Sequence, residues 1–496
     1  MRRGTVELPM AASRDSTVPL AVQIAAQLRT AMTEGRLAGG ERLPASRALA
    51  AELGVSRTVV NGAYAQLFAE GWIEGRHGSG TYVADGAPAD HPTATPPPAG
   101  RYSPVAPAAP PAGRHSPVAP AAPPAGRHSR VAAAGPAAAI DLRPGIPWTA
   151  DIDRAAWRRA WRTAGLQPPI APHPAGLAEL RAALAVYVRR SRGIQCTPAE
   201  ILVTQGIAGG LSLVAATLLR PGDRVGVEEP GYPVARDVLA AHGVQVVPCP
   251  VDGDGLVVSD LPAGLKLIYT TPSHQYPLGG RLPVPRRRAL IAWARASGAL
   301  IAEDDYDGEF RYDVAPLPAL YSLDPGVVIY LGTTTKTFTP ALRVGWLAAR
   351  PELATMLAQT ADRLDARASG PAQHAVLTLL AGGDLERHIR RTRHEYARRR
   401  AALTAVFRDG KAGHLLGDEA GLHVVLQTSR DADADVATFS QHGVAVATLA
   451  RFYAGPVTGN GLVIGYGGAT LAQVGRGSQI LRRVLAGAAA SNRGPG

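Results

Sequence analysis

The sequence has few lysines, cysteines and aromatic residues. Only three of its 52 basic side chains are lysines (Lys266, Lys336 and Lys411), so 49 are arginines. Arginine cannot deprotonate to form a Schiff base, whereas a desolvated lysine can, so a chemically required lysine stands out in this chain. The two cysteines, Cys196 and Cys249, exclude a disulfide framework and favour a reducing cytoplasm.

The chain also lacks a long apolar segment. No uncharged apolar run reaches the ~18 residues of a membrane-spanning helix, and the first ten residues lack the apolar core of a signal peptide. We therefore expect a cytoplasmic protein with no membrane partner. A length of 496 residues predicts two or three domains, and the net charge of +12 is compatible with a polyanionic partner.

Residues 19–84 have the pattern of a helical unit that ends in a hairpin. Apolar side chains recur every four positions in residues 20–32 and predict an amphipathic helix. Ser46 is the predicted N-cap of a second helix, and a third helix is expected over residues 57–70. With a hairpin over residues 72–83, this pattern predicts a winged helix-turn-helix. A three-helix protein-interaction module is the alternative.

Residues 85–139 differ in composition from the rest of the chain. A 13-residue Pro/Ala-rich repeat starts at Pro98 and at Pro111, and begins again at Pro124. Such a sequence cannot bury a core, so we expect a disordered linker whose arginines are solubilising charges. The predicted domains are therefore residues 1–84, 85–139 and 140–496.

From residue 140 onward, short apolar strands alternate with helix-like stretches, which indicates a parallel α/β architecture. The strand over residues 299–302 ends in carboxylates that include Asp304, and the strand over residues 327–331 leads into a hydroxyl-rich turn that contains Lys336. Ligands bind at the carboxyl ends of strands in open α/β sheets. Both segments should therefore meet at one edge of the sheet.

The segments EDDYDGEFRY (303–312) and GTTTKTFTPALRVG (332–345) resemble the cofactor motifs of fold-type I pyridoxal-phosphate (PLP) aminotransferases. In particular, they resemble the aminotransferase-like domain of MocR-type regulators in the GntR superfamily. The resemblance implies that Lys336 forms the internal aldimine with pyridoxal 5′-phosphate. It also implies that Asp304 pairs with the pyridinium nitrogen, Tyr306 bonds the ring hydroxyl, Tyr232 stacks on the ring, and the phosphate is held by Arg343, Thr333, Thr335, Gly206, Ile207 and Ala208.

Residues 39–83 are similar to a GntR-type winged helix over nearly the whole unit. The resemblance implies DNA contacts by Arg47, Ser56, Arg57, Thr58, Asn61 and, at the wing tip in the minor groove, His77 and Gly78. Residues 56–61 would open the recognition helix, whose N-terminal residues reach base edges. Arg57 is suited to reading a guanine, and Arg47 to holding a phosphate.

Two positions bear on activity and on the effector. Tyr276 stands where catalytic aminotransferases usually carry an asparagine that bonds the ring hydroxyl, which disfavours efficient transamination. Arg451 is a candidate for the arginine that binds a substrate carboxylate in many class I aminotransferases. We predict no catalytic residue and no metal site.

The leading hypothesis is a PLP-dependent transcription regulator that binds double-stranded operator DNA and is not an enzyme. It would sense PLP, or an amine or amino acid, through aldimine chemistry at Lys336. The resemblance implies a domain-swapped, head-to-tail homodimer. An active aminotransferase with a fused DNA-binding domain is the second hypothesis, and a DNA-binding protein with a purely structural aminotransferase-like scaffold is the third. The residues leave the effector, the operator and the direction of regulation open.

Overall fold

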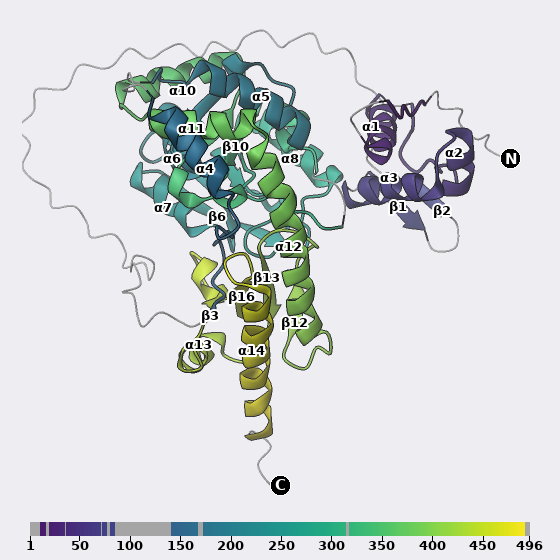
Figure 1. Cartoon of the computed structure of the whole chain (residues 1–496), viewed down its shortest axis with the longest axis vertical. Helices are drawn as coiled ribbons and strands as arrows, with labels where there is room; N and C mark the ends of the chain where they lie inside the picture. The colour runs from purple at the N-terminus through teal and green to yellow at the C-terminus, as the bar shows by residue number, and fades with distance from the viewer. Residues whose placement is uncertain are drawn as a thin grey trace, which may run out of the picture. The chain divides into compact units, whose positions relative to one another are not determined.

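The computed structural model describes residues 10–15, 19–34, 36–70, 72–76, 80–84, 140–166, 172–313 and 317–491 (Figure 1). The chain divides into two compact units at residues 136 and 137. The predicted linker, residues 85–139, lies outside the described residues, as do His77 and Gly78.

The N-terminal unit consists of helices and a β-hairpin. Its elements are α1 (Leu20–Thr33), α2 (Ser46–Glu52), α3 (Arg57–Glu70), β1 (Ile73–Arg76) and β2 (Gly80–Val83). The buried side chains of Ile24, Leu28 and Met32 recur every fourth residue of α1 and form one wall of a small core. The opposite wall includes Val60 and Leu67 of α3. The apolar residues that predicted the period of α1 are therefore the ones on its buried face.

One detail of the prediction is wrong. Ser46 is the first residue of α2 rather than its N-cap, because Ala45 takes the extended N-cap conformation and makes no side-chain hydrogen bond. The Ser46 hydroxyl instead accepts a hydrogen bond of 3.4 Å from Nε of Arg57, at the start of α3. After α2, Gly54 adopts φ +61°, a conformation that glycine reaches without strain and that turns the chain toward α3.

The C-terminal unit is built on an eight-stranded sheet with the order β4-β11-β10-β9-β8-β5-β6-β7. The strands are β4 (Ile201–Thr204), β5 (Arg224–Glu229), β6 (Gln245–Asp252), β7 (Gly255–Leu256), β8 (Leu265–Thr270), β9 (Leu300–Asp304), β10 (Val328–Thr333) and β11 (Gly345–Ala348). The central neighbours from β10 through β6 run parallel, whereas β11 is antiparallel to both of its neighbours. The carboxyl ends of β9 and β10 therefore lie at the same edge.

Helices cover both faces of this sheet (Figure 1). The helices of the unit are α4 (Arg154–Ala164), α5 (Ala178–Arg192), α6 (Gly206–Leu218), α7 (Pro233–Ala241), α8 (Val284–Ser297), α9 (Thr334–Thr337), α10 (Pro351–Arg363), α11 (Gly370–Ala381), α12 (Asp384–Phe407), α13 (Ala432–Gln441) and α14 (Leu471–Ser491). Along β10, Ile329 and Leu331 belong to one apolar cluster together with side chains of α6, α7 and α10. Val328 and Tyr330 belong to a second cluster together with side chains of α5, α8 and α11. Every residue of β10 is buried. The strand therefore starts with four consecutive apolar residues instead of alternating apolar and polar ones, as expected for a strand covered on both faces.

A smaller antiparallel sheet forms the core of the C-terminal lobe, which we define as residues 414–491. Its strands are β12 (His414–Leu416), β13 (His423–Gln427), β16 (Gly461–Gly465) and β15 (Ala447–Thr448), in that order. The entry strand β3 (Ile140–Asp141) pairs with β14 (Val444–Ala445) of this lobe, and α14 packs along α12. The predicted α/β fold is confirmed. Within the part of the chain that the structure describes, no helix combines the length and apolarity needed to cross a membrane.

Candidate functional site

The predicted cofactor residues meet in one cavity at the carboxyl edge of the large sheet. Parallel pairing of β9 and β10 sets Asp304 beside Leu331, a few residues before Lys336. The cavity has a volume of about 270 Å³. It is lined by all ten predicted residues (Lys336, Asp304, Tyr306, Tyr232, Arg343, Thr333, Thr335, Gly206, Ile207 and Ala208) and by Gln205, Val234, Tyr269, Thr271, Tyr276 and Pro340.

The carboxylate of Asp304 is buried and half satisfied. Its Oδ2 accepts a hydrogen bond from the hydroxyl of Tyr269, whereas its Oδ1 has no hydrogen-bond partner among the residues that the structure describes. Burial raises the pKa of Asp304 to about 8, although the hydrogen bond from Tyr269 lowers it. A protonated pyridine nitrogen fits this site, because it would supply both a donor for Oδ1 and a positive charge that favours the carboxylate.

The amine of Lys336 reaches the same cavity from α9. Its Nζ donates a hydrogen bond of 2.6 Å to the carbonyl oxygen of Gly145. The side chain borders the open cavity and is half-buried overall, yet burial lowers the pKa of its amine. Desolvation makes the neutral, nucleophilic form of the amine more accessible, which suits reaction with an aldehyde.

The segment that carries Lys336 is a short helix rather than the predicted hydroxyl-rich turn. Thr333 caps α9, because its Oγ1 accepts a hydrogen bond of 3.0 Å from the backbone N–H of Thr335. The two hydroxyls also lie 2.9 Å apart. Arg343, which adopts the left-handed conformation at φ +48°, adds an exposed guanidinium to the cavity wall. Hydroxyls and a guanidinium are suitable partners for phosphate oxygens.

Backbone amides at the start of α6 complete this anion-binding end. The N–H groups of Gly206, Ile207 and Ala208 belong to the first helical turn, which has no internal acceptors for them. Gly206 adopts φ +74°. A Cβ at Gly345 of β11 would lie 2.7 Å from Cα of Gly206, so glycine is required where β11 passes the start of the helix.

Aromatic side chains form the remaining wall. The rings of Tyr232 and Tyr276 are edge-to-face with centroids 5.7 Å apart, and those of Tyr276 and Tyr306 are 5.5 Å apart. The Tyr306 hydroxyl lies 2.9 Å from Nδ1 of His274. Burial raises the pKa of Tyr232 to about 12 and that of Tyr306 well above its usual value, so both phenols stay protonated and can donate hydrogen bonds.

The site residues that sequence reasoning did not find include Gly145, Tyr269 and His274. Tyr269 had a detectable signal, because it lies near the end of β8, the parallel neighbour of the strand that ends in Asp304. Gly145 and His274 lie in irregular segments and gave none. Arg451 lies exposed in the 3₁₀ turn Leu449–Phe452, whose Phe452 ring is 5.4 Å from that of Tyr276.

The N-terminal unit presents a second candidate site. Five predicted DNA contacts are exposed: Arg47 on α2, Ser56 immediately before α3, and Arg57, Thr58 and Asn61 on its first turns. The Ser56 hydroxyl accepts a hydrogen bond of 3.4 Å from the backbone N–H of Val59 and so caps α3. Exposed side chains at the start of the second helix of a helix-turn-helix are those that reach base edges in the major groove.

Comparisons with known proteins match both units. Residues 20–83 match the family of bacterial regulatory proteins, gntR family, and residues 155–460 match aminotransferase class I and II. The HTH-type pyridoxine biosynthesis transcriptional regulator PdxR of Corynebacterium glutamicum is 36% identical over 470 residues, which cover 93% of this chain and 95% of that protein. The probable rhizopine catabolism regulatory protein MocR of Rhizobium meliloti is 33% identical over 469 residues, 92% of this chain and 91% of that protein.

Solved structures resemble the C-terminal unit. The crystal structure of an archaeal alanine:glyoxylate aminotransferase superposes with a TM-score of 0.66 and 25% identity, over 70% of this chain and 90% of that one. The similarity to regulators thus extends along nearly the whole chain, whereas this similarity to an enzyme covers 70% of it.

Proposed function

Since this chain belongs to the MocR-type GntR family of transcriptional regulators, we propose that it senses PLP in the cavity around Lys336. The observation that carries the proposal is that the half-buried amine of Lys336 and a buried oxygen of Asp304 with no partner among the described residues border the same cavity. When bound, PLP supplies an aldehyde that condenses with a primary amine and a pyridine ring that withdraws electrons from the product.

Each part of the cavity has a role in holding this ligand. Asp304 would accept a hydrogen bond from the pyridinium nitrogen, and Tyr306 would donate one to the ring hydroxyl. Tyr232 would stack on the ring. The first turn of α6, together with Thr333, Thr335 and Arg343, would bind the phosphate.

Similarity to a regulator of pyridoxine biosynthesis over nearly the whole chain favours PLP itself as the effector. An amine or amino acid that reacts with bound PLP is the alternative effector. Similarity to a probable regulator of rhizopine catabolism is the reason to include such compounds in the test. The strand β16 presents only buried apolar and glycine residues, so Arg451 remains the candidate partner for an effector carboxylate.

The DNA-binding unit would read double-stranded operator DNA in the cytoplasm. Arg57 and Asn61 would contact base edges from the start of α3, and Arg47 would contact a phosphate. His77 and Gly78 stay a prediction for the wing tip. We propose a domain-swapped, head-to-tail homodimer that reads two half-sites, and that PLP shifts the equilibrium between two arrangements of the dimer by binding one of them more tightly.

An active aminotransferase is the second candidate function. Lys336, Asp304 and Arg343 are all present in the cavity and would support transamination. Tyr276 opposes it, because this bulky side chain replaces the usual asparagine and packs edge-to-face against both Tyr232 and Tyr306. We therefore propose effector sensing rather than turnover as the function of the site.

The test is an absorption spectrum of the full-length protein titrated with PLP, followed by borohydride reduction and mass spectrometry of the labelled peptide. Wild type should show a spectrum different from free PLP and carry the label on Lys336. Lys336→Ala should carry none, while the matched control Lys266→Ala, which removes an exposed lysine on β8, should behave as wild type.

The same samples separate sensing from catalysis. A panel of amines and amino acids should leave the PLP in the aldehyde oxidation state or form a persistent adduct. Steady conversion to the pyridoxamine form with release of a keto acid would instead identify an aminotransferase. If wild type fails to bind PLP at all, the sensing proposal is wrong and only the DNA-binding part survives.

A further inference from the structure

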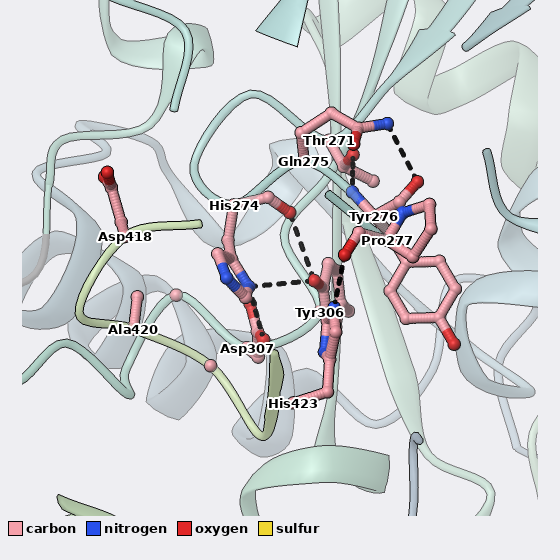
Figure 2. A network of polar contacts seen from close by, with 12 residues as sticks. Thr271, His274, Gln275, Tyr276, Pro277, Tyr306, Asp307, Asp418, Ala420 and His423 are labelled. Atoms are coloured by element: carbon pink, nitrogen blue, oxygen red, sulfur yellow. Dashed lines mark hydrogen bonds and ion pairs between the residues drawn. The ribbon is translucent and has the colours of Figure 1, made fainter. Parts of the chain in front are cut away.

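The cavity wall that Tyr306 forms is backed by a buried polar cluster of His274, Asp307 and His423 (Figure 2). His274 lies in the loop after β8, Asp307 in the loop after β9, and His423 at the first residue of β13 in the C-terminal lobe. Their exposed fractions are 3%, 2% and 3%. Burying three ionisable groups costs free energy unless each group is hydrogen-bonded, so each of these side chains should have a hydrogen-bond partner.

His274 holds the hydroxyl of Tyr306 through two different atoms. Its ring Nδ1 lies 2.9 Å from the Tyr306 oxygen, and its backbone carbonyl oxygen lies 3.1 Å from the same atom. The ring nitrogen is also 2.9 Å from Oδ2 of Asp307. As Figure 2 shows, one nitrogen of the imidazole therefore contacts both the aspartate and the phenol.

A carboxylate oxygen accepts hydrogen bonds, so the tautomer of His274 with its proton on Nδ1 can donate to Oδ2 of Asp307. In this tautomer the same N–H is shared with the oxygen of Tyr306. The phenol of Tyr306 stays protonated because burial raises its pKa. With its oxygen held in place by Nδ1–H, the phenol proton can turn either to the carbonyl of His274 or into the cavity.

The C-terminal lobe seals this arrangement. Gly421 adopts φ +73°, and a Cβ there would lie 2.1 Å from Cε1 of His274 and 2.8 Å from Oδ2 of Asp307. The backbone N–H of Gly421 donates a hydrogen bond of 2.7 Å to the carbonyl of Phe310 in the large domain, which we define as the part of the C-terminal unit that precedes the lobe (residues 140–413). A glycine of the lobe thus lies directly against the imidazole–carboxylate pair and leaves little room for water.

His423 adds a second contact between the lobe and the large domain. Burial, together with the neighbouring His274, lowers the pKa of His423 to about 4, so its ring is neutral. Its Nε2 is 2.9 Å from the carbonyl oxygen of Pro277 and donates to it. This contact fixes the lobe against the loop that carries both His274 and Tyr276.

The cluster also resembles a metal site, because one ligand atom of each residue lies within 4.8 Å of the others. An ion bound to Nδ1 of His274 would have to replace its contacts with Asp307 and Tyr306. Both contacts have ordinary hydrogen-bond lengths. The geometry therefore favours a hydrogen-bonded cluster over a metal centre.

We propose that His274 is a positioning residue, oriented by Asp307 and enclosed by the C-terminal lobe, that aims the hydroxyl of Tyr306 at the ring hydroxyl of PLP. The inference rests on the proposed function, since it requires PLP in the cavity. If His274 acts in this way, the hydrogen bond from Tyr306 to the ring hydroxyl depends on the position of the C-terminal lobe. A movement of residues 421–423 away from the large domain would hydrate His274 and release Tyr306.

The test compares PLP with 3-deoxypyridoxal phosphate, an analogue that lacks the ring hydroxyl, by measuring the Kd of each for the full-length protein. His274→Gln leaves the Nδ1 position without a donor and should weaken PLP binding roughly tenfold, the effect of one hydrogen bond. The analogue should bind this variant and wild type alike. His274→Asn keeps an N–H near the Nδ1 position and should restore most of the affinity for PLP.

Two further variants test the route of the effect. Tyr306→Phe should lose the same preference for PLP over the analogue. Adding His274→Gln to this variant should cause no further loss of PLP affinity. Gly421→Ala keeps the imidazole but forces a methyl group against it, and should also lose the preference. This variant keeps the inference falsifiable if His274→Gln does not fold.

Three results would overturn the inference. Equal weakening of both ligands in His274→Gln or Gly421→Ala would show a merely structural role. Additive losses in the double variant would show that His274 does not act through Tyr306. Stoichiometric metal in the purified wild type would show that His274, Asp307 and His423 form a metal site rather than a hydrogen-bonded cluster. Unchanged PLP binding by His274→Gln refutes this inference alone, whereas failure of wild type to bind PLP refutes the proposed function as well.

Discussion

Replacing Asp304 with asparagine should make the PLP-free protein more stable at alkaline pH and, at the same time, a poorer binder of PLP. Both effects follow from one carboxylate that is 3% exposed, has one oxygen bonded to Tyr269 and has the other without a described partner. Asparagine has nearly the same shape and carries no charge. The substitution therefore changes the electrostatics of the site and little of its packing.

The pH dependence follows from burial, which raises the pKa of Asp304 from 3.8 to about 8. Between these values the folded protein keeps a proton that the unfolded chain has lost, so the free energy of unfolding falls as the pH rises. The stabilisation is fully present below about pH 4 and is lost as the pH passes through 8. At about 1.4 kcal/mol per pH unit, wild type should lose roughly 3–4 kcal/mol relative to Asp304→Asn between about pH 5 and pH 8.

The effect on PLP has the opposite sign. In the bound state the carboxylate would face a pyridinium cation, and removing one partner of a buried charge pair costs about 3–5 kcal/mol. Since ~1.4 kcal/mol is a factor of ten, the Kd for PLP should rise at least about a hundredfold. A residue that destabilises the empty site and strengthens the occupied one is typical of a binding site that is built for its ligand.

The assay is denaturant unfolding of the full-length chain, freed of PLP, at three pH values, with PLP affinity measured on the same preparations. Glu303 and Glu309, whose pKa values burial raises to about 7, titrate in both proteins, so the difference between variants isolates Asp304. Asp365→Asn, at an exposed aspartate paired with Arg367, is the matched control and should follow wild type. Parallel pH profiles for wild type and Asp304→Asn, or equal affinity for PLP, would refute the reasoning.

Three other substitutions test separate parts of the account. Tyr269→Phe removes the donor to the bonded carboxylate oxygen, and isothermal titration should show PLP binding weakened about five- to tenfold; unchanged affinity would remove this tyrosine from the site. Gly345→Ala places a Cβ 2.7 Å from Cα of Gly206, so both the melting temperature and PLP affinity should fall, with a cost of about 1–3 kcal/mol; a variant that binds and melts normally would contradict the close approach. Arg57→Ala should weaken operator binding by about 1–3 kcal/mol and relax the preference at one base pair in a binding-site selection. Arg36→Ala, outside the predicted DNA contacts, should do neither. Equal losses of operator affinity in the two variants would indicate a nonspecific charge effect.

The sequence was most informative where a general rule of sheet architecture applied. Strand ends that carry Asp304 and Lys336 were expected at one edge, because parallel strands end together, and the pairing of β9 with β10 confirms this. The helical period of residues 20–32 likewise predicted the buried face of α1. The roles of the cavity residues toward PLP, and of the exposed residues of α2 and α3 toward DNA, stay predictions.

Details that depend on contacts between distant segments could not be predicted. The carbonyl of Gly145 meets Lys336, which is 191 residues away, and His423 meets Pro277 across 146 residues. Nothing in either local sequence encodes such a pairing. Short-range capping was also predicted wrongly, because α2 begins at Ser46 with Ala45 at the N-cap, and the Ser46 hydroxyl pairs with Arg57 of the next helix.

The measurement that tests the central claim most directly is the affinity of the full-length protein for a selected operator, with and without PLP. The account predicts that PLP changes the operator Kd of wild type at least about fivefold, the lower range of allosteric coupling. Lys336→Ala should bind the same operator with an affinity that PLP leaves unchanged, and Lys266→Ala should respond as wild type. No response to PLP in wild type, or an equal response in Lys336→Ala, would contradict sensing at this lysine.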